Sequence, residues 1–171
     1  MFESCVLGVD PGVAATGLAV IARRDRGAEI RWADVIRTPS DLAEAQRLLF
    51  IHHHVRRAIA AHRPGSVAIE RVAWNRNQVS ALRVARATGA IMLAAAEAGL
   101  AVEEYGPLEV KMAVAGSGTA DKAQVRDALA RLHGLEGVPR QPDAADAVAV
   151  ALCHLTQARL RRAARAVAEL R

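Results

Sequence analysis

An apolar run at residues 5–9, stopped abruptly by Asp10-Pro11-Gly12, is the feature that most restricts the fold. Five apolar residues ended by turn-forming residues are typical of a buried central β-strand. A strand of this kind needs other strands beside it and helices that cover its faces. The run therefore favours an α/β fold, and it leaves an acidic residue, Asp10, at the end of the buried strand.

Four further strands are predicted from short apolar segments. They are a hairpin over 16–23 and 29–36, followed by single strands at 67–69 and 100–105. Helical spacing predicts the remaining elements, which are helices over 41–62, 77–99 and 119–133, a short helix from Pro107 and a last helix from Pro142. This order is that of a mixed five-stranded sheet with helices on both faces.

Two details of the predicted helices can be checked against a structure. We expect Asp41, with Glu44 three residues later, to cap the helix over 41–62, and Thr119 to cap the helix over 119–133. The helix over 77–99 carries apolar residues on more than one side, so one face is expected to meet a partner subunit.

The composition limits the class of protein. The 171 residues predict a single domain, 1–158, followed by a basic helical tail, 159–171. Hydrophobic residues make up 52% and aromatic residues only 3%, which excludes a disordered or fibrous chain. No stretch reaches the roughly 18 consecutive apolar residues of a membrane span, and the start lacks a signal-peptide pattern. Two cysteines in apolar runs favour a reducing compartment, the cytoplasm.

Four acidic residues lie where acidic residues are unusual. Asp10 and Glu70 each end a buried strand, and Asp143 and Asp146 begin an alanine-rich helix. A spacing of three places the last two on one helix face. Carboxylates buried together need a cation, and oxygen ligands suit Mg²⁺ or Mn²⁺. Two such ions, about 3.5–4 Å apart, can support phosphodiester hydrolysis.

Each acid also has a purely structural interpretation when it is taken alone. Asp10 before Pro11-Gly12 fits a turn stabilised by its own side chain. Asp143 and Asp146 fit the positive end of a helix dipole. Glu70 fits the end of any strand. The metal-site hypothesis depends on the four occurring together.

The motifs that carry chemistry resemble those of the RuvC-type Holliday-junction resolvases in order and spacing, from about residue 5 to about residue 158. In chain order they are Leu7-Gly8-Val9-Asp10-Pro11-Gly12 with Thr16-Gly17, Ala68-Ile69-Glu70-Arg71-Val72, Glu104-Tyr105 with Val110-Lys111, Gly116-Ser117-Gly118-Thr119-Ala120-Asp121-Lys122-Ala123-Gln124-Val125, and Asp143-Ala144-Ala145-Asp146-Ala147 with His154.

The resemblance implies a ribonuclease H-like fold and a homodimer that binds four-way DNA junctions. It implies paired, Mg²⁺-dependent nicks with two ions per site, in recombination and DNA repair, and it makes the RuvA and RuvB branch-migration proteins candidate partners. By position, Asp10, Glu70, Asp143 and Asp146 would be the catalytic metal ligands. Lys111 and Lys122 would lie near the scissile phosphate, with Lys122 assisting catalysis.

Two departures from the family pattern affect the expected DNA contacts. Ala73 stands where members often have a stacking aromatic residue, and Trp74 follows it as a substitute or as a core residue. The usual Gly-Gln-Ala-Arg-Gly stretch is here Ala85-Arg86-Ala87-Thr88-Gly89. Candidate DNA-binding residues, which a solvated helix face would also explain, are Arg71, Trp74, Asn75, Arg76, Asn77, Arg83 and Arg86.

Two other functions are compatible with these residues. One is a junction-binding scaffold with weak or no catalysis, which the altered aromatic position would suit. The other is a nuclease of the same fold that processes structured RNA. Substrate preference and metal-dependent product formation distinguish the three.

Overall fold

The computed structural model describes residues 5–25, 27–72 and 78–168, with the side chains of the last helix described as far as residue 158. The predicted DNA contacts at Trp74, Asn75, Arg76 and Asn77 lie outside the described residues. The prediction for the side chains of the basic tail, 159–171, lies outside them as well.

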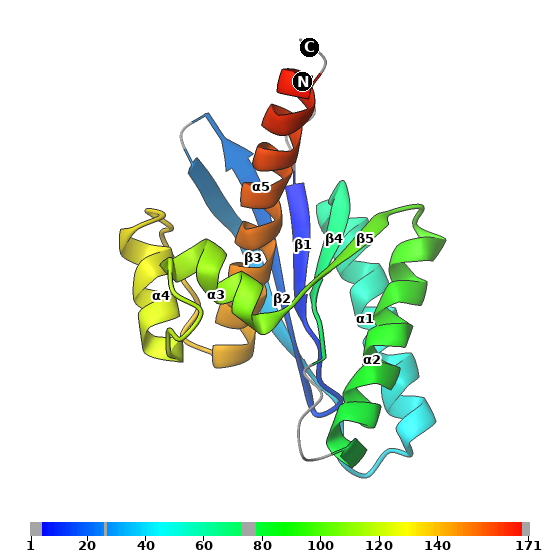
Figure 1. Ribbon diagram of the computed structural model, residues 1–171. Helices are drawn as coiled ribbons and strands as arrows, with labels where there is room; N and C mark the ends of the chain where they lie inside the picture. Colours follow the sequence, from blue (N-terminus) through cyan, green and yellow to red (C-terminus); the bar gives the residue numbers. More distant parts are fainter. Residues whose placement is uncertain (1–4, 26, 73–77, 169–171) are drawn as a thin grey trace.

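One sheet of five strands forms the centre of the molecule, in the order β3-β2-β1-β4-β5 (Figure 1). The strands are β1 (Cys5–Asp10), β2 (Ala15–Arg24), β3 (Gly27–Arg37), β4 (Ser66–Glu70) and β5 (Ala101–Tyr105). The first three are antiparallel neighbours, whereas β4 pairs in parallel with both β1 and β5. The predicted mixed sheet, with the first apolar run as its central strand, is confirmed.

Five helices cover the sheet. They are α1 (Glu44–His62), α2 (Gln78–Glu97), α3 (Pro107–Ala115), α4 (Lys122–Arg131) and α5 (Pro142–Ala168). Figure 1 shows α1 and α2 on one side of the sheet and α3, α4 and α5 on the other. Because the connections from β1 to β4 and from β4 to β5 are parallel crossovers, the long helices α1 and α2 are required to return the chain.

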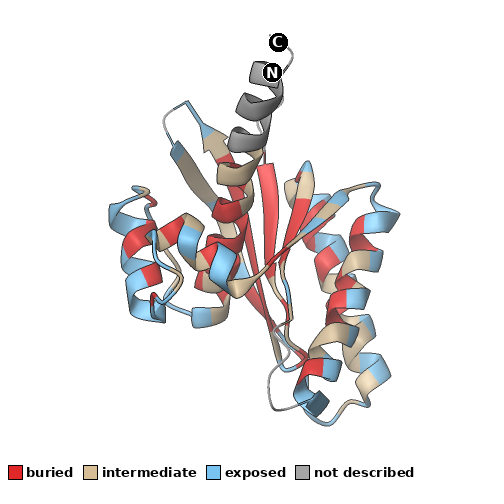
Figure 2. Cartoon of the chain, viewed as in Figure 1, coloured by how far each residue is buried: buried red, intermediate tan, exposed pale blue. Residues whose placement is uncertain are grey.

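Each face of the sheet has its own apolar core, and Figure 2 shows the buried residues concentrated there. Strand residues alternate between the two layers: Val6 packs towards α3, α4 and α5, whereas Leu7 packs towards α1 and α2. Most of the buried residues are Ala, Val, Leu and Ile, as the low aromatic content requires.

Glycines let α5 lie unusually close to the sheet. A Cβ at Gly8 of β1 would overlap the carbonyl oxygen of Ala147, and a Cβ at Gly17 of β2 would overlap that of Asp143. The first turns of α5 therefore rest directly on the two central strands. Asp10 pairs with Gly17 across β1 and β2, so the same contact brings the start of α5 to the end of β1.

The two predicted helix caps are wrong. Helix α1 begins at Glu44, after a turn at residues 40–42, and Glu44 forms an ion pair with Arg86 of α2 in place of a capping box with Asp41. Helix α4 begins at Lys122, where Asp121 and Gln124 form the capping box. The Thr119 hydroxyl contacts Ser117 instead.

Among the described residues, α2 is the one helix that is long and apolar enough to cross a bilayer by length and composition. Its apolar character has a structural cause here, because Ala87, Ile91 and Ala95 are fully buried in the core beneath the sheet. The opposite side of this helix exposes Val79, Leu82 and Leu93.

Candidate active site

Asp10 and Glu70 meet where two parallel strands end. Val9 of β1 pairs with Ile69 of β4, so the next and last residue of each strand, Asp10 and Glu70, lies at the same end of the sheet. Burial is the largest cause of a raised pKa at the Asp10 carboxyl; together with the nearby charges of Glu70 and Asp146 and a hydrogen bond to Glu70, it raises this pKa to about 8. Burial also raises the pKa of Glu70. Without a cation, the Asp10 carboxyl therefore keeps its proton at neutral pH.

Helix α5 brings the other two acids to this edge. Asp143 and Asp146 lie in its first turns, and the charges of both contribute to the raised pKa of Asp10. The close contact at Gly17 determines how near the start of α5, and with it these two acids, lies to β2. The prediction placed all four acids together, and the structure does bring them to one end of the sheet.

The site also contains two lysines. Lys122, at the start of α4, donates a hydrogen bond from Nζ to Oδ2 of Asp146 at 2.6 Å, and this bond raises the pKa of Lys122. The charge of Lys111, on α3, acts on Glu70 and opposes the rise of its pKa. The 23 basic residues of the chain include only these two lysines, the other 21 being arginines. Sequence reasoning could have used that count and did not.

The donor set fits a hard divalent cation. Four carboxylates converge without a histidine or cysteine, and oxygen donors of this kind suit Mg²⁺ or Mn²⁺. In the described part of the chain, no three acidic, histidine or cysteine side chains are grouped closely enough to enclose an ion as they stand. The Asp146 carboxylate forms an ion pair with Lys122. To share a metal ion with the other acids, Asp146 would have to give up this ion pair.

A hollow of about 210 Å³ opens beside Asp10 and Glu70. Its other walls include Arg71, Ser80 and Val84. The main-chain N–H of Arg71 donates to the carbonyl of Tyr105, and its guanidinium donates to that of Glu104. Arg71 is exposed and lies at the site, where it can meet a bound phosphate.

The two arginines predicted on α2 differ in their surroundings. Arg86 makes a bidentate contact with Glu44 of α1, at 2.9 and 3.0 Å, which joins the two helices. Arg83 is exposed and lines a second hollow next to the first, with Arg47 of α1 on another wall. The sequence analysis missed Arg47, since one arginine on a polar helix face carries no distinguishing signal.

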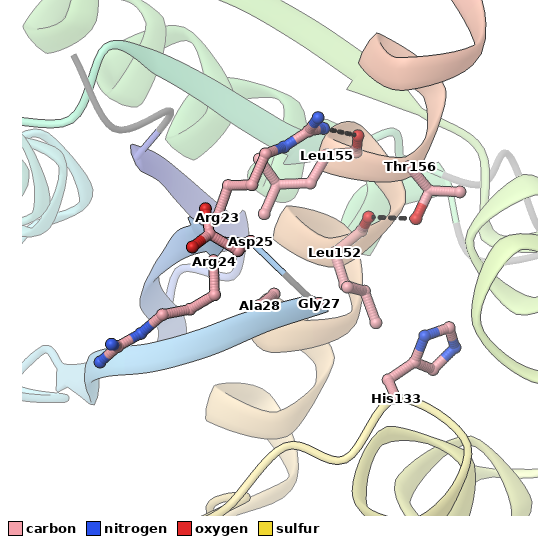
Figure 3. Close-up of a pocket in the computed structure, with 9 residues that line it drawn as sticks. All are labelled: Arg23, Arg24, Asp25, Gly27, Ala28, His133, Leu152, Leu155 and Thr156. Atoms are coloured by element: carbon pink, nitrogen blue, oxygen red, sulfur yellow. Dashed lines mark hydrogen bonds between the residues drawn. The ribbon is translucent and has the colours of Figure 1, made fainter. Parts of the chain in front are cut away.

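A separate hollow of about 520 Å³ lies at the other end of β2, against the middle of α5 (Figure 3). Its lining residues include Arg23, Asp25, His133 and Thr156, and none of the predicted site residues. Arg23 donates from Nη2 to the carbonyl oxygen of Leu155 at 2.7 Å, and His133 contacts the carbonyl oxygen of Val114. The chemistry of the acidic cluster is therefore remote from this larger hollow.

Comparison with known proteins shows the family of this chain. The family model of crossover junction endodeoxyribonuclease RuvC matches residues 6–154. Relatives of that name include one from Moorella thermoacetica, 44% identical over 95% of this chain and 98% of its own length, and one from Mycobacterium bovis, 46% identical over 90% and 82%. The solved structure of Thermus thermophilus RuvC in complex with a Holliday junction substrate superposes with a TM-score of 0.85, at 37% identity, covering 92% of this chain and 96% of the other.

The sheet order, the two helical layers and the acids at one strand edge thus define an enzyme of the ribonuclease H-like class, a nuclease. Within that class, the chain belongs to the RuvC family of crossover junction endodeoxyribonucleases.

Proposed function

We propose that this chain is a structure-selective endonuclease that binds four-way DNA junctions and makes paired, symmetric nicks in them, in recombination and DNA repair. The observation that carries the proposal is the meeting of Asp10 and Glu70, at two strand ends, with Asp143 and Asp146 of α5. Family membership supplies the substrate, because the relatives are crossover junction endodeoxyribonucleases.

A metal requirement follows from the same four acids. Nucleases of this family depend on a metal ion, and we propose Mg²⁺ as the ion, with Asp10, Glu70, Asp143 and Asp146 as its ligands. Two such ions, or Mn²⁺ in their place, would supply activation of a water molecule and stabilisation of the leaving oxygen. The raised pKa of Asp10 supports this choice, since a carboxyl that holds its proton without a cation is one that a cation would ionise.

The lysines have complementary parts in this proposal. Lys122 holds Asp146 by a hydrogen bond in the metal-free state, which orients that carboxylate. With Asp146 holding a metal ion, the ammonium group of Lys122 would be available to the scissile phosphate, where it would offset charge near the leaving group. Lys111 adds positive charge on the Glu70 side of the site. Arg71 contacts the DNA backbone from the wall of the same hollow.

Paired nicks require two active sites, and we propose a homodimer that uses the exposed side of α2. Val79, Leu82 and Leu93 of that helix are 66%, 47% and 56% exposed, which is unusual for large apolar residues on one element. Covering them with the same surface of a second copy would place two sites on one junction. We expect residues 1–158 to form the nuclease domain, 159–171 to act as a basic tail, and RuvA and RuvB to be partners in the cytoplasm.

A comparison of substrates tests the proposed function. Purified protein is incubated with Mg²⁺ or with EDTA, and with an end-labelled mobile four-way junction, a linear duplex of the same sequence or a structured RNA. We expect symmetric nicks in the junction alone, and only with metal. Preferential cleavage of the RNA would show a processing ribonuclease. Tight binding of the junction with no product in Mg²⁺ or Mn²⁺ would show a scaffold.

A further inference from the structure

A second hollow adjoins the acidic site and has the opposite charge. It measures about 290 Å³ and is lined by the main chain of residues 12–15, by Arg47 and by Arg83. Ser80 and Val84 of α2 line both this hollow and the one beside Asp10 and Glu70. One turn of α2 therefore separates a place that holds carboxylates from a place that holds two guanidinium groups.

Arg47 is fixed in position and retains unused donors. Its Nε donates to the Thr38 hydroxyl at 2.7 Å and its Nη2 to the carbonyl oxygen of Val13 at 3.3 Å. A guanidinium group has five N–H donors. The two bonds orient the group, and among the described residues it makes no ion pair, so the other N–H groups are available to a ligand.

The loop that forms the floor of the hollow is held from both ends. The Thr16 hydroxyl donates to the carbonyl oxygen of Gly12 at 2.6 Å, and the Thr38 hydroxyl donates to that of Val13 at 2.6 Å. Both threonines are buried, Thr16 completely. The position of the floor relative to Asp10 is therefore fixed before any ligand binds, which lowers the entropy cost of binding.

Arg83 supplies the second cation from the other wall. It is exposed and has no ion pair or hydrogen bond within the described part of the chain, in contrast to Arg86, which Glu44 already binds. The residues that line this hollow include no acid and no aromatic ring. Two guanidinium groups without a counter-ion match a phosphate, and the absence of a ring from the lining leaves no surface for stacking a base.

We propose that this hollow binds one backbone phosphodiester of the DNA strand being cut, a phosphate next to the scissile one, between Arg47 and Arg83. The inference deepens the proposed function and rests on it for the identity of the strand. Arg47 and Arg83 are positioning residues: by holding the neighbouring phosphate, they set the scissile phosphate over Asp10 and Glu70.

The test pairs protein variants with neutral linkages in the DNA. Junctions carry a single methylphosphonate in place of one phosphate, placed in turn at each position within three nucleotides of the crossover. Binding is measured in EDTA for wild type, Arg83→Gln, Arg47→Gln and the control Arg57→Gln. The control removes an equal charge from an exposed position on α1 that is away from the hollow. Thermal unfolding of each variant shows whether the fold is kept.

For wild type and Arg57→Gln, we expect one position next to the cut where the neutral linkage weakens binding by about threefold to tenfold. In Arg83→Gln this loss should become clearly smaller, because only Arg47 then contacts the phosphate. The salt dependence of its binding should also decrease by the equivalent of about one phosphate. Arg47→Gln should reduce the effect at the same position. If Arg47→Gln does not fold, the variant of the exposed Arg83 still tests the proposal.

Equal losses in Arg83→Gln and wild type at every position would overturn the subsite, as would a wild type without a sensitive position next to the cut. Because binding is read without metal, this result is separate from cleavage. A wild-type protein that binds the junction but never cuts it contradicts the proposed activity and leaves the scan readable. A wild type that does not bind the junction contradicts both.

Discussion

Gly17 of β2 lies against the carbonyl oxygen of Asp143, closely enough that any side chain at residue 17 would overlap it. Gly17 is also the strand partner of Asp10. Because residue 17 is a glycine, without a side chain, the start of α5 and its acids can lie close to the acid at the end of β1. The site depends on backbone packing as much as on the acids themselves.

The first prediction concerns this contact. Gly17→Ala should lower stability by about 1–3 kcal/mol, because the new methyl group must displace α5, and should lower the cleavage rate further by moving Asp143 and Asp146. Gly65→Ala is the matched control, since a Cβ there meets only the carbonyl oxygen of Cys5, at 3.7 Å, at the other end of β1 from Asp10. Thermal unfolding and cleavage at saturating junction measure both effects. A Gly17→Ala protein as active as Gly65→Ala would contradict the packing argument.

A second prediction follows from the raised pKa of Asp10. An unfolded aspartate ionises near pH 3.8, whereas the folded one keeps its proton to about pH 8. Between these values the folded chain holds more protons, so the contribution of this group to stability decreases as the pH rises. In EDTA at pH 8, Asp10→Asn should therefore be more stable than wild type by about 2–4 kcal/mol, and the difference should shrink towards pH 5.

Thermal melts of wild type, Asp10→Asn and the exposed control Asp41→Asn at both pH values measure that difference. Each kcal/mol corresponds to about 2–4 °C in a chain of this size. Adding Mg²⁺ should raise the melting temperature of wild type more than that of Asp10→Asn. If Asp10→Asn melts below wild type at pH 8 without metal, ionising Asp10 does not destabilise the folded protein and the prediction is wrong.

The lysine count permits a third, chemical prediction. Acylation of amines can reach only Lys111, Lys122 and the N-terminal amine, because every other basic side chain that carries a permanent charge is an arginine. Mild acetylation should abolish cleavage, and bound junction DNA should protect against it. Lys122→Arg, which cannot be acetylated, keeps the charge and should retain part of the rate. Mass spectrometry identifies the modified lysine, and full activity after modification of Lys122 would exclude its proposed part.

A fourth prediction separates the two arginines of α2. Since Glu44 already neutralises Arg86, Arg86→Gln should weaken junction binding less than Arg83→Gln, and should cost at most about 1 kcal/mol of stability as an exposed ion pair. Freeing Arg86 by Glu44→Gln should instead leave binding equal or slightly tighter. Binding titrations at two salt concentrations measure the difference. A larger loss for Arg86→Gln would mean that DNA displaces Glu44.

The sheet and the acids were predictable because their signals are local. A short apolar run that ends at Asp10 or Glu70 shows both the strand and the acid at its edge, and Asp143 and Asp146 share a helix face by spacing alone. The order of the elements along the chain suggested a mixed five-stranded sheet, and the observed sheet is of that kind.

The failed predictions have two causes, which are partners far along the chain and, at one helix start, a local competitor. The cap at Asp41 failed because Glu44 pairs with Arg86, 42 residues away. Thr119 failed as a cap because Asp121 competes two residues later with a complete capping box. Arg47 was missed because its position depends on Thr38 and Val13, which come from a strand end and a loop outside its own helix.

The central claim is that the four acids form a metal-dependent site for cutting junction DNA, and Asp10→Asn tests it most directly. Binding and Mg²⁺-dependent cleavage of an end-labelled four-way junction are measured side by side for wild type and this variant. We predict that Asp10→Asn binds the junction nearly as tightly as wild type and makes no product, a loss of at least about a thousandfold. Normal cleavage by Asp10→Asn would contradict the assignment of the site.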